Sequence, residues 1–266
     1  MDHRATRQVK VRSRVKTLVA GPLLSFALVA AIPMMAQTSA SGASTQIWAN
    51  VLLDYPHEKD SLFEINIEPK TQVSEGEWRS LALTPLFEYY PLRWLDLEGE
   101  LRLAWTQESE GTDSREVTPR LGFRVNLFSD LRERGGPVLG VLFHRVRLAT
   151  LIRIEYRNLF YTDGSPSSHQ WRFRARLESK IGITDVDLSR DGTLYATADV
   201  EFYVPFGADV SERFASKLRT RAGLGYRFSY KWRAELLYVR DANRQTKDDP
   251  FATSTNAADA RIKVFF

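Results

Sequence analysis

The chain has 266 residues, no cysteine and a formal net charge of +4 at pH 7. The lack of cysteine excludes a disulfide scaffold, a thiolate metal site and a cysteine nucleophile. The basic excess lies in the first sixteen residues, and the remainder has 31 basic and 32 acidic side chains. Composition therefore predicts no nucleic-acid partner.

Residues 1–40 have the order of a secretory signal peptide. The basic segment Met1–Lys16 precedes the uncharged apolar run Thr17–Ile32, and small residues follow. The alternative is a signal anchor or a short transmembrane helix, but the run is shorter than the roughly 18–20 residues that a spanning helix needs. We expect cleavage near residues 36–40 and a mature domain over residues 41–266.

After residue 45, apolar and polar residues alternate with a period of two, which is the pattern of β-strands. For example, Ile152 and Ile154 alternate with Arg153 and Glu155. No linker separates the segments that show this pattern, so we predict one all-β domain. The segments are 46–55, 62–69, 78–90, 94–106, 117–127, 145–160, 170–183, 194–206, 217–228, 232–240 and 258–266.

The connections between these segments are of two kinds. Tight ones are expected at Tyr90–Leu92 and Ser229–Lys231. Longer polar ones are expected at Gln107–Arg115, Thr162–His169 and Asp241–Asn256. Short turns at one end and longer loops at the other are typical of outer-membrane barrels.

The aromatic residues on the apolar faces favour a membrane barrel over a soluble, lipocalin-like one. If the last strand runs toward the periplasm, alternation sorts them into two belts around a band of Leu, Ala, Val and Ile. Such belts are typical of strands that cross a bilayer. The predicted outer belt is Trp105, Tyr156, Trp171, Phe202, Phe206 and Tyr238, and the inner belt is Phe87, Tyr89, Tyr226, Phe228, Trp232 and Phe266.

The last segment, Ala258–Phe266, resembles the assembly signal of bacterial outer-membrane β-barrels, with Ile262, Val264 and a terminal aromatic at Phe266. More narrowly, the sequence is similar to an uncharacterised family, domain-of-unknown-function family twenty-four-ninety. The similarity is carried by Gln46–Trp48, Phe63–Pro69, Arg153–Arg157 and Gly223–Phe228.

This resemblance implies a porin-like, antiparallel, transmembrane up-and-down β-barrel in the bacterial outer membrane. It also implies contact with outer-membrane lipid and with the barrel-assembly machinery, and it implies no ligand. Bacterial barrels have an even strand number with both termini periplasmic. Since eleven segments are counted, we predict about twelve strands, with ten as the alternative. The twelfth would lie in Gln37–Thr45, or Pro137–Phe143 would be separate.

Inward packing of the polar faces predicts an arginine-rich lumen. Guanidinium groups suit carboxylates and phosphates, so one interpretation is a narrow pore or a binding well for a small anionic solute. The other is a structural barrel filled by arginine–carboxylate pairs, because about twelve strands lie between a filled barrel and a channel. The candidate lumen-lining residues are Arg120, Arg124, Arg147, Arg153, Arg157, Arg172, Arg174, Arg176, Asp199, Glu201, Arg219 and Arg221.

Two other classes of function stay open. A surface-exposed binding protein would act through the loops Gln107–Arg115 and Asp241–Asn256. An outer-membrane hydrolase would need a serine beside a histidine with an orienting partner.

The histidines after the signal are His57, His144 and His169, and His169 borders a loop that contains three serines, Ser165, Ser167 and Ser168. No motif pairs these residues, so we expect no enzymatic activity, no catalytic residue, no cofactor and no metal site. Gly122, Gly223 and Gly225 lack phosphate-loop spacing and are expected where the barrel wall bends. The sequence does not indicate an oligomeric state.

Overall fold

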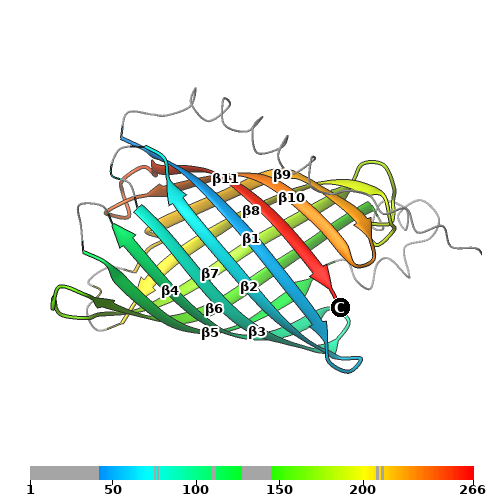
Figure 1. Ribbon diagram of the computed structural model, residues 1–266, viewed down its shortest axis with the longest axis horizontal. Helices are drawn as coiled ribbons and strands as arrows, with labels where there is room; N and C mark the ends of the chain where they lie inside the picture. The colour runs from blue at the N-terminus through cyan, green and yellow to red at the C-terminus, as the bar shows by residue number, and fades with distance from the viewer. Residues whose placement is uncertain are drawn as a thin grey trace, which may run out of the picture.

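The computed structural model describes residues 42–74, 76, 78–108, 112–127, 145–207, 210 and 213–266. All eleven alternating segments of the sequence are strands (Figure 1). They are β1 (Ser44–Pro56), β2 (Ser61–Gln72), β3 (Trp78–Leu92), β4 (Leu95–Glu108), β5 (Ser114–Asn126), β6 (Val146–Tyr161), β7 (Ser168–Gly182), β8 (Thr193–Phe206), β9 (Lys217–Ser229), β10 (Trp232–Asn243) and β11 (Ala252–Phe265). In these described ranges, no helix is long and apolar enough to span a membrane. The predicted signal peptide lies outside them.

The eleven strands form one closed ring. Each strand pairs antiparallel with the next, from β1–β2 to β10–β11. The ring is closed by a parallel pair, β1 with β11, whose register runs from Ser44 opposite Thr255 to Asp54 opposite Phe265. Figure 1 shows these two strands side by side, pointing the same way.

The described barrel thus has eleven strands, close to the predicted number of about twelve and one more than the alternative of ten. Parallel closure allows an odd number, because β1 and β11 need not run in opposite directions. Thr45, the end of the segment expected to hold a hidden strand, belongs to β1 itself. β5 pairs directly with β6, so no strand lies between them; residues 137–143 lie outside the described ranges.

The two ends of the barrel are called the Ser44 end, where β1 begins, and the Phe266 end, where β11 finishes. The Phe266 end holds the connections β1–β2, β3–β4, β5–β6, β7–β8 and β9–β10, and the Ser44 end holds the others. Short turns were expected at one end of the barrel and longer loops at the other, and the structure shows this separation only in part. The Phe266 end has the shortest connections, 93–94 and 230–231, but also the long ones 127–145 and 183–192.

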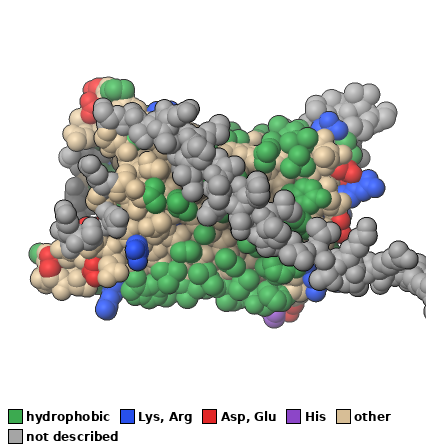
Figure 2. All heavy atoms as spheres, turned by 45° about the horizontal axis from the view of Figure 1, so that its top comes forward, with side chains coloured by type: hydrophobic (Ala, Val, Ile, Leu, Met, Phe, Trp, Pro, Cys, Tyr) green, Lys and Arg blue, Asp and Glu red, His purple; other side chains and the backbone are tan. Residues whose placement is uncertain are grey.

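The barrel is packed with its apolar faces outward. Leu121 on β5 is 74% exposed, whereas Glu155 on β6 and Asp259 on β11 are 0% exposed. Exposed aromatics lie near both ends of the strands, with Trp105 and Trp171 toward the Ser44 end and Phe87 and Trp232 toward the Phe266 end. Figure 2 shows a broad hydrophobic band along the wall, with the visible charged side chains gathered near the two ends.

Gly225 on β9 makes room for a tyrosine inside the barrel. It lies directly opposite Tyr195 on β8, and a Cβ at Gly225 would come within 2.3 Å of the tyrosine ring. The Tyr195 hydroxyl donates a hydrogen bond of 2.8 Å to Glu235, so the ring cannot move away without losing it. Close approach, rather than a bend, explains this glycine.

Replacing Gly225 by alanine is therefore expected to lower the free energy of unfolding by about 1–3 kcal/mol, because the added methyl overpacks the site. Denaturant titration of the folded protein measures the change. Gly99→Ala is the matched control, since a Cβ there meets only Leu121 at 3.7 Å. Equal stability of the two variants would contradict the packing argument.

Candidate functional site

A cavity of about 940 Å³ occupies the lumen of the barrel. Every one of the eleven strands contributes to its lining. It extends from Lys70 and Lys217, near the Ser44 end, to Leu92 and Phe265, near the Phe266 end. Among the described lining residues are eighteen Lys and Arg side chains but only nine Asp and Glu, so the lining has an excess of positive charge.

Ten of the predicted lumen-lining residues border this cavity; their functional role stays a prediction. The other two, Asp199 and Glu201, do not line the cavity but bind arginines that do. Arg221 bonds Asp199 at 2.8 Å, and Arg174 bonds Glu201 at 2.6 Å. The ten are Arg120, Arg124, Arg147, Arg153, Arg157, Arg172, Arg174, Arg176, Arg219 and Arg221.

Glu155 is the centre of the charge network on the wall formed by β5, β6 and β7. Its carboxylate is fully buried and lies 3.3 Å from Arg120, 3.1 Å from Arg172 and 3.2 Å from Arg174. Burying an ionised carboxylate is costly unless charged hydrogen-bond donors surround it. The three guanidinium groups supply this compensation.

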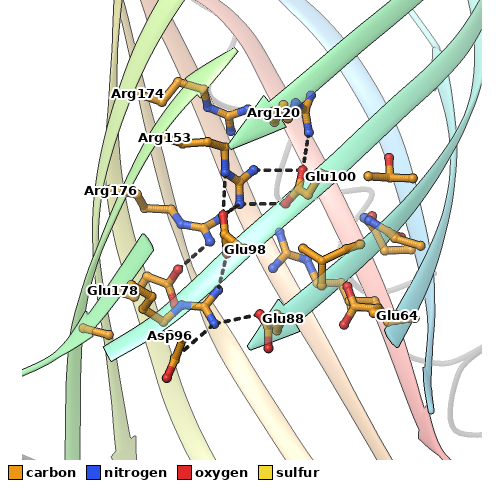
Figure 3. A pocket seen from close by; sticks show the side chains of 18 of the residues that line it. Glu64, Glu88, Asp96, Glu98, Glu100, Arg120, Arg153, Arg174, Arg176 and Glu178 are labelled. Carbon is orange, nitrogen blue, oxygen red and sulfur yellow. Dashed lines mark hydrogen bonds and ion pairs between the residues drawn. The ribbon is translucent and has the colours of Figure 1, made fainter. Parts of the chain in front are cut away.

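A second group of ion pairs joins β4 to β5 and β6. Arg153 reaches Glu98 at 2.6 Å and Glu100 at 2.8 Å, and Arg120 reaches Glu100 at 2.9 Å. Figure 3 shows Arg120 and Arg153 converging on Glu100. These ion pairs link neighbouring and next-neighbouring strands along the wall and stabilise their alignment. The cavity lies beside them.

Partners on β1, β10 and β11 were not among the predicted lumen-lining residues. Lys263 on β11 pairs with Asp54 at 2.9 Å, Lys180 on β7 pairs with Glu235 at 2.6 Å, and Arg219 on β9 pairs with Asp241 at 2.6 Å. Glu235 and Lys263 lie at polar positions of the alternating segments 232–240 and 258–266, whereas Asp241 lies in the segment Asp241–Asn256 that was expected to be a loop.

Two aromatic side chains inside the lumen, Trp48 and Tyr203, were also not predicted. Both are 3% exposed. The Lys70 ammonium lies 4.0 Å from the centre of the Trp48 ring, and the Arg174 guanidinium lies 4.7 Å from the centre of the Tyr203 ring. Cation–π contacts of this kind help to hold cations in a partly desolvated lumen.

Arg147 and Arg233 differ from the paired cations of the lumen. Both line the cavity, but neither has a carboxylate within ion-pair distance in the described part of the chain. Arg147 donates to the side chain of Asn126 at 3.1 Å, and Arg233 lies over the ring of Phe265 at 5.1 Å. Both therefore present positive charge to the cavity.

His169 is partnered on both ring nitrogens, although no motif in the sequence predicted a pairing. Its Nε2 lies 3.2 Å from the Ser167 hydroxyl, and its Nδ1 lies 2.8 Å from Oδ1 of Asn158. All three side chains lie at the Ser44 end, outside the lumen. Within the described ranges, no group of three or more His, Asp and Glu side chains could hold a metal ion.

Comparison with known families identifies the family of this chain. A family model described as "Protein of unknown function (DUF2490)" matches residues 45–252, from the beginning of β1 to the beginning of β11. The chain belongs to this family. The match confirms the DUF2490 family that the sequence resembles, and no curated protein matches the chain.

Changing Glu155 to glutamine is expected to lower the free energy of unfolding of this DUF2490 barrel by about 3–5 kcal/mol, because three guanidinium groups lose their shared counter-charge. The midpoint of urea unfolding measures the effect. The control is Asp185→Asn in the β7–β8 connection, whose partner Arg190 is 71% exposed. The control should leave the midpoint nearly unchanged; an equal effect in both variants would refute the buried network as a source of stability.

Proposed function

We propose that this chain is an outer-membrane β-barrel whose lumen is a narrow, water-filled passage for small anions. The observation that carries the proposal is the inside-out packing. Large apolar side chains such as Leu121 and Leu224 are exposed on the wall, while Glu155, Glu201 and Asp259 are buried inside. A barrel in water would need the opposite arrangement.

The aromatic belts support the same placement. Trp105, Trp171 and Phe202 are exposed near the Ser44 end, and Phe87 and Trp232 near the Phe266 end. Rings of this type are favoured at the headgroup level of a bilayer, and aliphatic side chains are favoured between them. Strands of 12 to 16 residues are long enough to cross a bilayer at the usual tilt.

A passage is favoured over a filled barrel because a cavity remains beside the ion pairs. Its lining includes residues near both ends of the barrel, such as Lys217 and Phe265, and has twice as many cationic as anionic side chains. The carboxylates of Glu155 and Glu201 neutralise arginines but do not border the cavity. The water-facing charge is therefore positive, which favours anions.

The contacts of the last residue fit the proposed role of Ile262, Val264 and Phe266 in assembly. The Phe266 ring stacks on Tyr55 of β1 at 4.5 Å, and its backbone N–H donates to the Asp54 carbonyl at 3.0 Å. The terminal aromatic thus connects the two strands that close the ring. We propose that the Phe266 end faces the periplasm.

If the wall faces lipid, Leu121→Arg should impair insertion into vesicles and destabilise the barrel. The expected cost is about 2–4 kcal/mol near mid-depth and falls toward the interface. Leu127→Arg, six residues along the same face and just beyond β5, is the matched control with an expected small effect. Heat-modifiable electrophoretic mobility after refolding into vesicles reports assembly. Similar yields for both variants would speak against lipid contact.

If the lumen conducts, planar bilayers containing the protein should show a reversal potential that favours chloride over potassium. The double variant Arg147→Gln, Arg233→Gln should reduce this preference without loss of folding, because neither arginine has a described carboxylate within ion-pair distance. Arg79→Gln, Arg240→Gln removes the same charge from exposed positions and should leave the preference unchanged. A folded wild-type barrel that never conducts would end the pore proposal and leave a structural barrel.

A further inference from the structure

Asn158, His169 and Ser167 form a hydrogen-bonded chain on the outer wall. Asn158 on β6 and His169 on β7 are directly opposite each other in the strand register. Asn158 shares the outward face of β6 with Ile154 and Phe160, both exposed. The order of contacts is the Ser167 hydroxyl, then Nε2 and Nδ1 of His169, then Oδ1 of Asn158, over 3.2 and 2.8 Å.

The hydrogen bonds of Asn158 determine the tautomer of His169. The amide nitrogen of Asn158 donates to the carbonyl of Val117 at 3.0 Å and to that of Tyr156 at 3.4 Å. Its oxygen must then be the atom that faces His169, because the two ends of an amide are distinguished by their partners. An oxygen only accepts, so Nδ1 of His169 carries the proton and Nε2 is left as a base toward Ser167.

Aromatic neighbours restrict the histidine ring. Tyr156 stacks on it with ring centres 6.1 Å apart and planes inclined by 14°, and Phe160 meets it edge-on at 6.4 Å. The ring is thus oriented by an amide on one side and by two aromatic residues, while Ser167 and His169 remain exposed. A nucleophile, a base and an orienting group in this order are the elements of serine hydrolases.

We infer that Ser167, His169 and Asn158 are a hydrolase site for fatty-acyl esters presented at the membrane surface. Ser167 Oγ bonds to the ester carbonyl carbon while His169 Nε2 accepts its proton, and His169 gives that proton to the departing alcohol as the ester C–O bond breaks. Water then attacks the acyl-serine, with its proton passing through His169 back to Ser167. The net reaction converts ester and water to carboxylic acid and alcohol.

The substrate class rests on the membrane placement proposed above. His169 lies two residues along β7 from Trp171, which belongs to the aromatic belt of the Ser44 end. If that belt marks the headgroup level, the three residues lie next to the ester bonds of lipids. The acid–base geometry of the three residues does not depend on this placement.

The test uses the full chain refolded from denaturant into detergent micelles, so that no host lipase is carried over. Substrates are p-nitrophenyl butyrate, which is water-soluble, and dihexanoyl-phosphatidylcholine below and above its micelle-forming concentration. We expect hydrolysis that increases when the lipid forms micelles, and covalent labelling of Ser167 by a fluorophosphonate. Ser167→Ala should lose both, and His169→Ala should lose about 10²- to 10⁴-fold in rate.

The controls are Ser165→Ala and Ser168→Ala, which remove neighbouring hydroxyls from the same segment and should keep full activity. Asn158 is a positioning residue, so Asn158→Ala should lower kcat at least about tenfold while KM stays the same. Heat-modifiable mobility confirms that each variant is folded.

Folded wild-type protein that neither hydrolyses these esters nor reacts with the fluorophosphonate would overturn the inference, even if it inserts into vesicles. Activity that is equally lost in Ser165→Ala would also overturn it. Hydrolysis that depends on Ser167 in a protein that does not insert into vesicles would support the site and contradict the membrane proposal instead.

Discussion

The structure depends on pairing its buried carboxylates with guanidinium or ammonium groups, most of which come from other strands. Glu155 is compensated by arginines of β5 and β7, and Glu201 by arginines of β7 and β9. Each pair is made only if the strands keep their register, because a shift by one residue would turn one partner outward. The charges that make the interior polar are thus also the ones that specify how the strands align.

This constraint also shapes the cavity. Because Glu155 and Glu201 are in contact with arginines on the wall, the water-facing surface is dominated by the arginines themselves. The barrel can therefore be well neutralised inside and still present positive charge to a solute. The ion pairs expected for a filled barrel are present in the wall, and the cationic lining beside them is the feature on which the pore proposal rests.

The strands could be predicted from the sequence because period-two alternation is a local property. All eleven segments are strands, and the expected twelfth strand came from applying the even-number rule for bacterial barrels to that count. The pairing of β1 with β11 could not be seen in the sequence, since it joins residues about 210 positions apart, such as Ser44 and Thr255. Arg233 lies on the predicted polar face of segment 232–240 but is not among the predicted lumen-lining residues.

The partners of His169 show a second limit. Ser167 is only two residues away in sequence, but Asn158 comes opposite His169 only through the register of β6 with β7. That register follows from the whole connection between the strands and from their ion pairs, so no spacing rule could supply it. The inward direction of the lumen arginines could be predicted more easily. It depends only on whether a residue is at an odd or an even position within its own strand.

The parallel pairing of β1 with β11 accounts for the polar side chains that join these two strands. A parallel pair is slightly less stable per residue than an antiparallel one, and here it must hold the ring closed. Asn50 on β1 donates to Asp259 on β11 at 2.7 Å, and Lys263 on β11 reaches Asp54 on β1 at 2.9 Å. Both acceptors are almost fully buried, so these bonds are shielded from water and add to the backbone pairing. The odd ring is thus closed by side chains as well as by its backbone, and the same buried-charge pairing that aligns the other strands also holds its first strand to its last.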